Sequence, residues 1–117
     1  MPTIRDLVAA LRQRDGVDAV AILGRDGLLI DGQALAEIDV ERVAAHVPSI
    51  IQCADELGAA AERGALQIAV LQYEQGLAVL SCFSPDAVLL VLLQPTANLG
   101  DLLYELRRHR ANMAALV

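Results

Sequence analysis

The stretch Ala87–Leu93 reads AVLLVLL, and every residue in it is apolar. The turn residues Ser84–Asp86 precede it and Pro95 follows it, so the run is too short for a typical helix and predicts a strand. A strand with apolar side chains on both faces needs a layer of protein against each face. We therefore expect a central strand in a three-layer domain, followed by a C-terminal amphipathic helix.

Length and composition indicate one domain, residues 1–117, with more apolar surface than a small monomer can cover. Hydrophobic residues make up 56% of the 117 residues and the mean hydropathy is +0.46, whereas aromatic residues make up only 3%. A chain of this length buries about two-thirds of its unfolded surface. We expect a core of Ala, Val, Leu and Ile, and some apolar surface buried against another chain.

The charge and the apolar runs exclude several partners. The net charge is −6 and the pI is about 4.7, whereas binding to nucleic acid needs a basic stripe. The basic cluster Arg107–Arg110 suits the C-terminal end of a helix dipole. No apolar run is long enough for a spanning helix, and Arg5 and Asp6 precede any stretch that could serve as a secretory signal. We expect a cytoplasmic protein with no nucleic-acid partner and no membrane insertion.

The first third of the chain predicts a helix followed by a hairpin. Thr3 and Asp6 have the spacing of a helix start, and apolar residues then recur at helical spacing. Val17–Leu23 is predicted to be a strand, and Gly24–Gly27 contains the Asp-Gly pair that hairpin turns favour. Leu28–Asp31 is the return strand, and its brevity is typical of a sheet edge.

A single long helix is predicted from Asp39, as N-cap, to about Glu62. Pro48 lies inside it, removes one backbone hydrogen bond and is expected to kink it. The apolar stripe of this helix comprises Val40, Val43, Ala44, Val47, Ile50, Ile51, Ala54, Leu57 and Ala61. The stripe is wider than one sheet face requires, so the helix is expected to touch something besides its own sheet. Cys53 in this helix and Cys82 in a later strand are expected to be reduced core residues.

Three strands with tight connections are predicted next, at Leu66–Tyr73, Leu77–Phe83 and Ala87–Leu93. Short connections of this kind produce an antiparallel meander. Two glutamines make Leu66–Tyr73 the most polar of the three, so it is expected to be the second edge of the sheet. Asn98 then serves as the N-cap of the last helix.

The sequence contains no strong catalytic, cofactor or metal motif. Gly24–Gly27 is not a phosphate loop, because neither a Lys-Ser/Thr pair nor a helix follows it. His46 and His109 have no ligand at metal-binding spacing. Ser81-Cys82 has no base nearby in sequence, and Asp55-Glu56 is predicted to belong to a solvated helix face. We expect a non-enzymatic binding or assembly module with no cofactor and no metal.

The chain resembles the roadblock / dynein light-chain domain family. GVDAVAILGRDGLLI, from Gly16 to Ile30, resembles the opening hairpin of that family. The segment from Gly64 to Arg108 resembles its three-strand meander and closing helix, with Asn98-Leu99-Gly100 and a final Glu-Leu-Arg-Arg as its most recognisable pieces. The resemblance covers nearly the whole chain.

This resemblance implies an α/β (α+β) fold in the order α-β-β-α-β-β-β-α. A five-stranded antiparallel sheet would be sandwiched between one long helix and the two terminal helices. It also implies homodimers or heterodimers, in which Leu66–Tyr73 pairs with its counterpart across a two-fold axis and the long helices lie side by side; for this chain we expect a homodimer. Bacterial and archaeal members resemble partners of small Ras-like GTPases, as activators or scaffolds, and the resemblance implies that role here.

Two sets of candidate site residues follow from the stripe and from the resemblance. The dimer interface is expected to include Val43, Val47, Ile50, Cys53, Ala54, Leu57, Leu66, Gln67, Ile68, Ala69 and Val70. The docking surface for the GTPase is expected to include Glu41, His46, Gln52, Glu56 and Arg63, on the side of the long helix away from the stripe. No catalytic residue is expected.

A small-molecule sensor of PAS-like or profilin-like architecture is the alternative function. Those domains also place helices around an antiparallel sheet. A sensor needs a cavity with convergent polar groups and aromatic walls. The chain contains one Phe, two Tyr and no Trp, which favours the GTPase regulator over the sensor.

Overall fold

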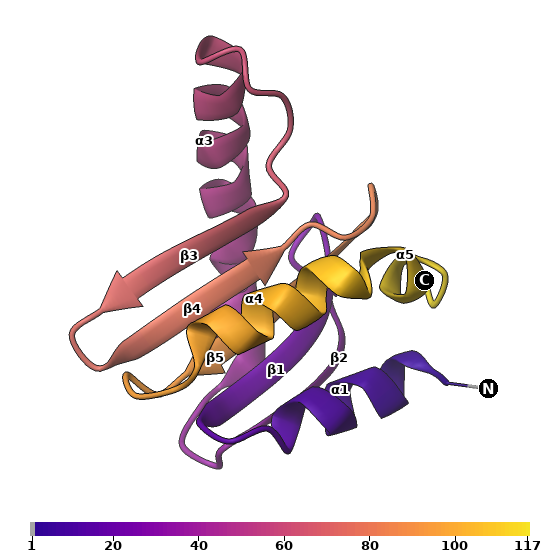
Figure 1. Cartoon of the computed structure of the whole chain (residues 1–117), viewed down its shortest axis with the longest axis vertical. Coiled ribbons are helices and arrows are strands. Elements are labelled where there is room, and N and C mark those ends of the chain that lie inside the picture. Colours follow the sequence, from indigo (N-terminus) through magenta and orange to yellow (C-terminus); the bar gives the residue numbers. More distant parts are fainter. Residues whose placement is uncertain (1) are drawn as a thin grey trace.

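A five-stranded sheet lies between two layers of helices in the computed structural model of the chain, which describes residues 2–117 (Figure 1). The elements, in chain order, are α1 (Ile4–Arg12), β1 (Val17–Gly24), β2 (Leu29–Ala34), α2 (Val40–Ala45), α3 (Val47–Ala60), β3 (Ile68–Tyr73), β4 (Gly76–Ser81), β5 (Ala87–Leu93), α4 (Leu99–Arg108) and α5 (Arg110–Ala114).

The strand order across the sheet is β2-β1-β5-β4-β3, and every neighbouring pair is antiparallel. β5 is therefore the central strand, and β2 and β3 are the two edges. Val88, Leu89 and Val91 of β5 are fully buried, which confirms the prediction from the AVLLVLL run. The five-stranded antiparallel sheet and the two predicted edge strands are also confirmed.

Each face of the sheet is covered by its own layer of helices. The terminal helices α1, α4 and α5 cover one face and contribute Val8 and Leu102 to its core. The segment α2–α3 covers the other face with Ala44 and Ile51. This arrangement confirms the expected placement of the terminal helices opposite the internal helical segment (Figure 1).

The prediction of one continuous helix is wrong, because the segment forms two helices, although the interruption occurs near Pro48, as predicted. α2 ends at Ala45, α3 begins at Val47, and His46 caps both. Pro48 occupies the first turn of α3, where its missing N–H would have had no intrahelical partner. In a continuous helix the Pro48 ring would clash with the carbonyl of Ala44, so the chain starts a new helix instead.

Several predicted boundaries are also wrong by a few residues. The return strand continues to Ala34, because Gly32–Ala34 pairs with β1 despite its low strand propensity. β3 starts at Ile68, although the Cys82 N–H still donates to the Gln67 carbonyl oxygen at 2.8 Å. The last helix breaks at His109, after which α5 adds a short segment that the sequence pattern did not indicate.

The C-terminal half of α3 extends past the sheet beyond β3 (Figure 1). The buried residues of this helix, Val47 and Ile51, lie in its first half. The helix ends in a Schellman motif, in which the Arg63 N–H donates to the Gly58 carbonyl oxygen at 2.7 Å. Glu62 occupies the left-handed position of this motif with φ of 57°, a conformation that glycine adopts without strain.

Replacing Glu62 with glycine is expected to raise the free energy of unfolding by about 1 kcal/mol, because the left-handed conformation costs a side chain about this much. Urea unfolding at a fixed protein concentration measures the change. Glu56→Gly, an exposed site within α3, is the matched control and should lower stability by about 1 kcal/mol. A loss of stability in Glu62→Gly would contradict the assignment of this cap.

Candidate interaction surface

The β3 edge is regular and open. Its six residues pair with β4 without a register shift, and no other strand within residues 2–117 pairs with it. The opposite edge, β2, is interrupted by a bulge next to Leu23. Bulges are a common way of blocking an edge against further pairing, whereas a regular edge can accept another strand. β3 is therefore the edge at which the sheet can be extended.

Side chains of β3 alternate between the two faces of the sheet. Ala69 and Leu71 pack against the α2–α3 layer, and Ile68 packs towards the α1–α4 layer. By the same alternation Tyr73 lies on the α3 face and Val70 on the α4 face. Val70 is 39% exposed and Tyr73 is 59% exposed, so both faces of the edge carry uncovered apolar surface.

The flank of α3 that faces the β3 edge is apolar. Successive residues of a helix turn by about 100°, so Ile50, Ala54, Leu57 and Ala61 follow the buried Ile51 on one side. Leu57 is 70% exposed. Cys53 is also exposed, which contradicts the expectation that it is a core residue. Cys53 lies on the side of the helix that points away from the sheet, so no other layer of the protein covers it.

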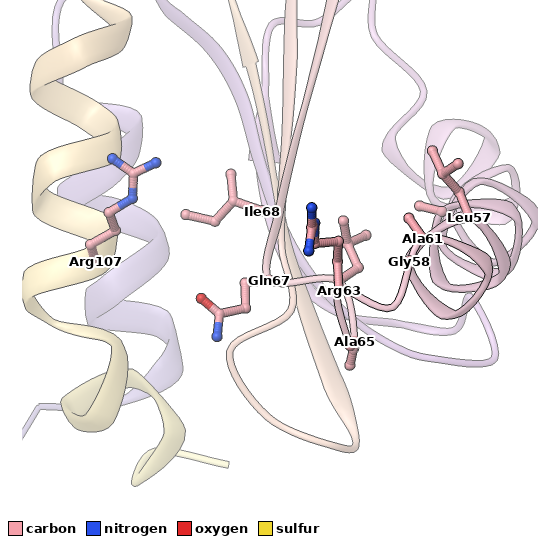
Figure 2. Close-up of a pocket in the computed structure, with 11 residues that line it drawn as sticks. Leu57, Gly58, Ala61, Arg63, Ala65, Gln67, Ile68 and Arg107 are labelled. Atoms are coloured by element: carbon pink, nitrogen blue, oxygen red, sulfur yellow. The ribbon is translucent and has the colours of Figure 1, made fainter.

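A groove of about 630 Å³ lies between this flank of α3 and the start of β3. Figure 2 shows Leu57 and Ala61 of α3 on one side of β3 and Arg107 of α4 on the other, with Arg63 near the strand. The residues that line the groove include these two arginines and no acidic residue. Within residues 2–117 neither Arg63 nor Arg107 forms an ion pair. The groove is therefore apolar along α3, and the charged side chains in its lining are both cationic.

Two residues of α3 fix the width of this groove. A Cβ atom on Gly58 would lie 2.4 Å from the carbonyl oxygen of Gly64, so only glycine allows the returning chain to approach the helix so closely. The Asp55 carboxylate accepts a hydrogen bond from the Leu66 N–H at 2.8 Å, and its second oxygen lies 3.6 Å from the Arg25 guanidinium. Asp55 thus connects α3 to the segment before β3 and to the β1–β2 hairpin.

The prediction that Asp55 belongs to a solvated face is wrong, because Asp55 is half-buried and has these two partners. Its neighbour Glu56 is exposed, as predicted. Both partners of Asp55 come from other parts of the chain, so the sequence around Asp55-Glu56 contains no signal for them.

The opposite flank of α3 is polar and faces the β1–β2 hairpin. Gln52 and Glu56 line a second groove of about 460 Å³ with Arg25 and Pro48. The Gln52 amide lies 3.5 Å from a Glu56 carboxylate oxygen. The two flanks of α3 therefore differ in chemistry, apolar towards β3 and polar towards the hairpin.

The five predicted docking residues are all exposed, but they do not form one continuous surface. Gln52 and Glu56 lie together on the hairpin flank of α3. Arg63 lies in the groove on the other flank, beside the start of β3. Glu41 is in α2, and His46 is at the junction of α2 and α3.

The predicted interface residues divide into three groups by burial. Val47 is 2% exposed and belongs to the core. The half-buried members are Val43, Ile50, Ala54, Leu66, Ile68 and Ala69. The exposed members are Cys53, Leu57, Gln67 and Val70.

Ser81 and Cys82 are buried between the sheet and its helices. The Ser81 hydroxyl has no hydrogen-bond partner within residues 2–117. Burial raises the pKa of the Cys82 thiol, against a smaller lowering by Arg25 and Arg110. A buried thiol with a raised pKa is protonated at neutral pH and is a weak nucleophile. Within the described part of the chain, no group of His, Cys, Asp and Glu side chains is arranged to hold a metal ion.

None of the helices in residues 2–117 combines the length and the hydropathy needed to cross a bilayer.

Comparison with known proteins identifies the family. The Roadblock/LC7 domain model matches residues 3–93. An uncharacterized protein of Methanocaldococcus jannaschii, MJ1340, is 26% identical over 106 residues, which cover 91% of this chain and 92% of the relative. That similarity extends over almost the full length of both proteins.

Solved structures share the fold at low sequence identity. The Roadblock/LC7 domain from Streptomyces avermitilis aligns with a TM-score of 0.83 at 20% identity and covers 95% of this chain and 94% of that one. MglB from Myxococcus xanthus aligns with a TM-score of 0.85 at 13% identity, over 98% and 97%. A further MglB structure, with a tetrameric arrangement, aligns with a TM-score of 0.84 at 16% identity, over 96% and 85%. These similarities show the shared fold, and the match of the domain model over residues 3–93 shows that the chain belongs to the Roadblock/LC7 family.

Proposed function

We propose that this protein is a non-enzymatic, dimeric adaptor or regulator of a small Ras-like GTPase. The observation that supports it best is the regular, open β3 edge beside the exposed apolar flank of α3. The membership of this chain in the Roadblock/LC7 family supports the same role, because the resemblance to that family implies partnership with small GTPases.

The dimer forms by antiparallel pairing of β3 with β3 of a second copy. This pairing uses the free backbone groups of both edges and joins the two sheets into one. The projecting half of α3 then lies over the junction, where its apolar flank, including Leu57, is covered by the second copy. The tetrameric MglB structure supports self-association, because that relative has the same fold.

The polar flank of α3 remains free in such a dimer and is available to the GTPase. Gln52 and Glu56 face the β1–β2 hairpin, away from the β3 edge. Charged groups at the rim of an interface mainly steer association, whereas a small apolar centre provides most of the affinity. The chain itself supplies no phosphate loop, so nucleotide hydrolysis is assigned to the GTPase and not to this protein.

A sensor function has less support. The groove of about 630 Å³ beside β3 is lined by no aromatic residue, although Arg63 and Arg107 contribute polar groups to its lining. Small-molecule sites are usually enclosed and lined by apolar and aromatic side chains around a few polar groups.

Self-association is tested with Leu57→Glu. The wild-type protein is expected to sediment as a dimer at micromolar concentration, and Leu57→Glu is expected to weaken the dimer by more than about tenfold, because it puts a charged group into an apolar contact. Leu28→Glu is the matched control: Leu28 is 71% exposed, close to the 70% of Leu57, but lies in the β1–β2 hairpin. A wild-type protein that sediments only at 12.5 kDa would contradict the dimer.

Hydrogen exchange tests whether the dimer forms through β3. The outward-facing amides of Ile68–Tyr73 are expected to exchange slowly in the wild-type dimer, because they donate to the second copy. In the Leu57→Glu variant the same amides should exchange faster, whereas those of the central strand Ala87–Leu93 should not change. Equal exchange of Ile68–Tyr73 in dimer and monomer would place the interface elsewhere.

The docking surface is tested with the double variant Gln52→Arg, Glu56→Arg. Its binding to the small Ras-like GTPases of the same organism is expected to be about tenfold weaker than that of the wild type, with the dimer intact. Isothermal titration with each GTPase in its GTP-bound and GDP-bound forms measures the affinity, and Glu37→Arg controls for charge alone. Unchanged affinity would remove this flank from the docking site. Hydrolysis of GTP by the purified protein alone would contradict the non-enzymatic role.

A further inference from the structure

We propose that the groove beside the start of β3 is a socket for Tyr73 and Glu74 of a second copy of this chain, with Arg63 and Arg107 pairing with that Glu74. This inference rests on the β3-to-β3 pairing of the proposed function. It goes further by naming the side chains that fix the register of the pair and select an identical partner.

The two ends of β3 carry opposite charge. The groove at its start contains Arg63 and Arg107 and no acidic residue. The other end of β3 leads into the two-residue turn Glu74-Gln75. Within residues 2–117, Glu74 forms no ion pair, and the two arginines form none either. Three unpaired charges therefore flank one open edge.

Antiparallel symmetry brings these two ends together. A two-fold axis normal to the sheet pairs residues whose side chains lie on the same face. The axis therefore passes beside one residue of β3, and this central residue pairs with its own counterpart in the second copy. Val70 and Leu71 are the two choices of central residue that leave the fewest residues of β3 unpaired. Centring on Val70 places Glu74 of the second copy opposite Leu66, and centring on Leu71 places it opposite Ile68. Leu66 and Ile68 both line the groove.

Tyr73 of the second copy would cover the apolar wall of the groove. By strand alternation Tyr73 lies on the α3 face, with Ala69 and Leu71. In the two registers it lies opposite Gln67 or Ala69 of the first copy, on the face where α3 projects past the edge. Tyr73 is 59% exposed in one copy, and its ring would pack against Leu57 of the other. Buried tyrosines are frequent anchors of protein interfaces.

The charges of Glu74, Arg63 and Arg107 would make this contact selective for an identical partner. Arg107 lies on the α4 side of β3, opposite the α3 flank, so the groove meets an aromatic ring on one face and a carboxylate on the other (Figure 2). A related chain with a neutral or basic residue in place of Glu74 would leave the two arginines unpaired or repelled. Such a mismatch disfavours the wrong partner more than it strengthens the right one.

Charge reversal provides the test. Glu74→Arg alone, and Arg63→Glu, Arg107→Glu together, are each expected to weaken the homodimer by about tenfold or more, because symmetry repeats the repulsion at two sites. An equimolar mixture of the two variants should restore dimerisation, because both sites of the mixed dimer then carry opposite charges. Glu37→Arg, an exposed residue of the loop before α2, is the control.

Sedimentation equilibrium of each variant and of the mixture, at low and high salt, measures these effects. The wild-type dimer should weaken with added salt, since exposed charges are screened. Tyr73→Ala should weaken it by about tenfold at either salt concentration.

The outcomes separate this inference from the proposed function. A wild-type protein that stays monomeric contradicts the proposed dimer itself. A stable wild-type dimer that tolerates Tyr73→Ala and both charge reversals overturns the socket alone. Weakened variants whose mixture remains monomeric overturn the ion pairing. Circular dichroism melts of the variants, which are all at exposed positions, establish that each one is folded.

Discussion

Burial of β5 on both faces is the constraint on which the rest of this structure depends. A strand without a polar face cannot border solvent, so both faces of the sheet need a helical layer. The terminal helices provide one layer and α2–α3 the other. β1 and β4 flank β5, which leaves β2 and β3 as edges. The position of the candidate interaction surface at β3 follows from this order, since a central β5 forces the first strand of the meander outwards.

The two edges differ because their local geometry differs. β2 carries a register shift, and the side chain of Asp31 accepts a hydrogen bond from the next N–H along the strand, at Gly32. β3 is regular over Ile68–Tyr73 and is flanked by the projecting half of α3. Asp55 and Gly58 hold that half of the helix close to the start of β3. An open edge, an apolar flank and two unpaired arginines therefore occur together at one end of the molecule.

Patterns of local sequence predicted most of the elements. The helical repeat of α1, the Asp-Gly hairpin, the seven apolar residues of β5 and the cap at Asn98 each act through near neighbours in the chain, and each is present in the structure. The long helix was the main error. Its apolar stripe continues through Pro48, but the stripe describes only which side is apolar, and not whether the backbone hydrogen bonds continue. Cys53 was misplaced for a different reason: it lies outside the stripe, about 200° around the helix from the buried Ile51, and therefore points away from the sheet.

The sequence by itself determined the fold class, the central strand, the two edges and the family resemblance, because periodicity and turn chemistry depend on residues close together in the chain. Only the tertiary structure decided the site. It brought Arg107 of the last helix into the lining of the same groove as Arg63 and Leu57, separated Arg63 from Gln52 and Glu56, and gave Asp55 partners from two other segments. Arg25 and Arg107 are distant in sequence from the α3 residues that they approach, and their proximity depends on how the helices pack on the sheet. No local pattern of the sequence contains this packing.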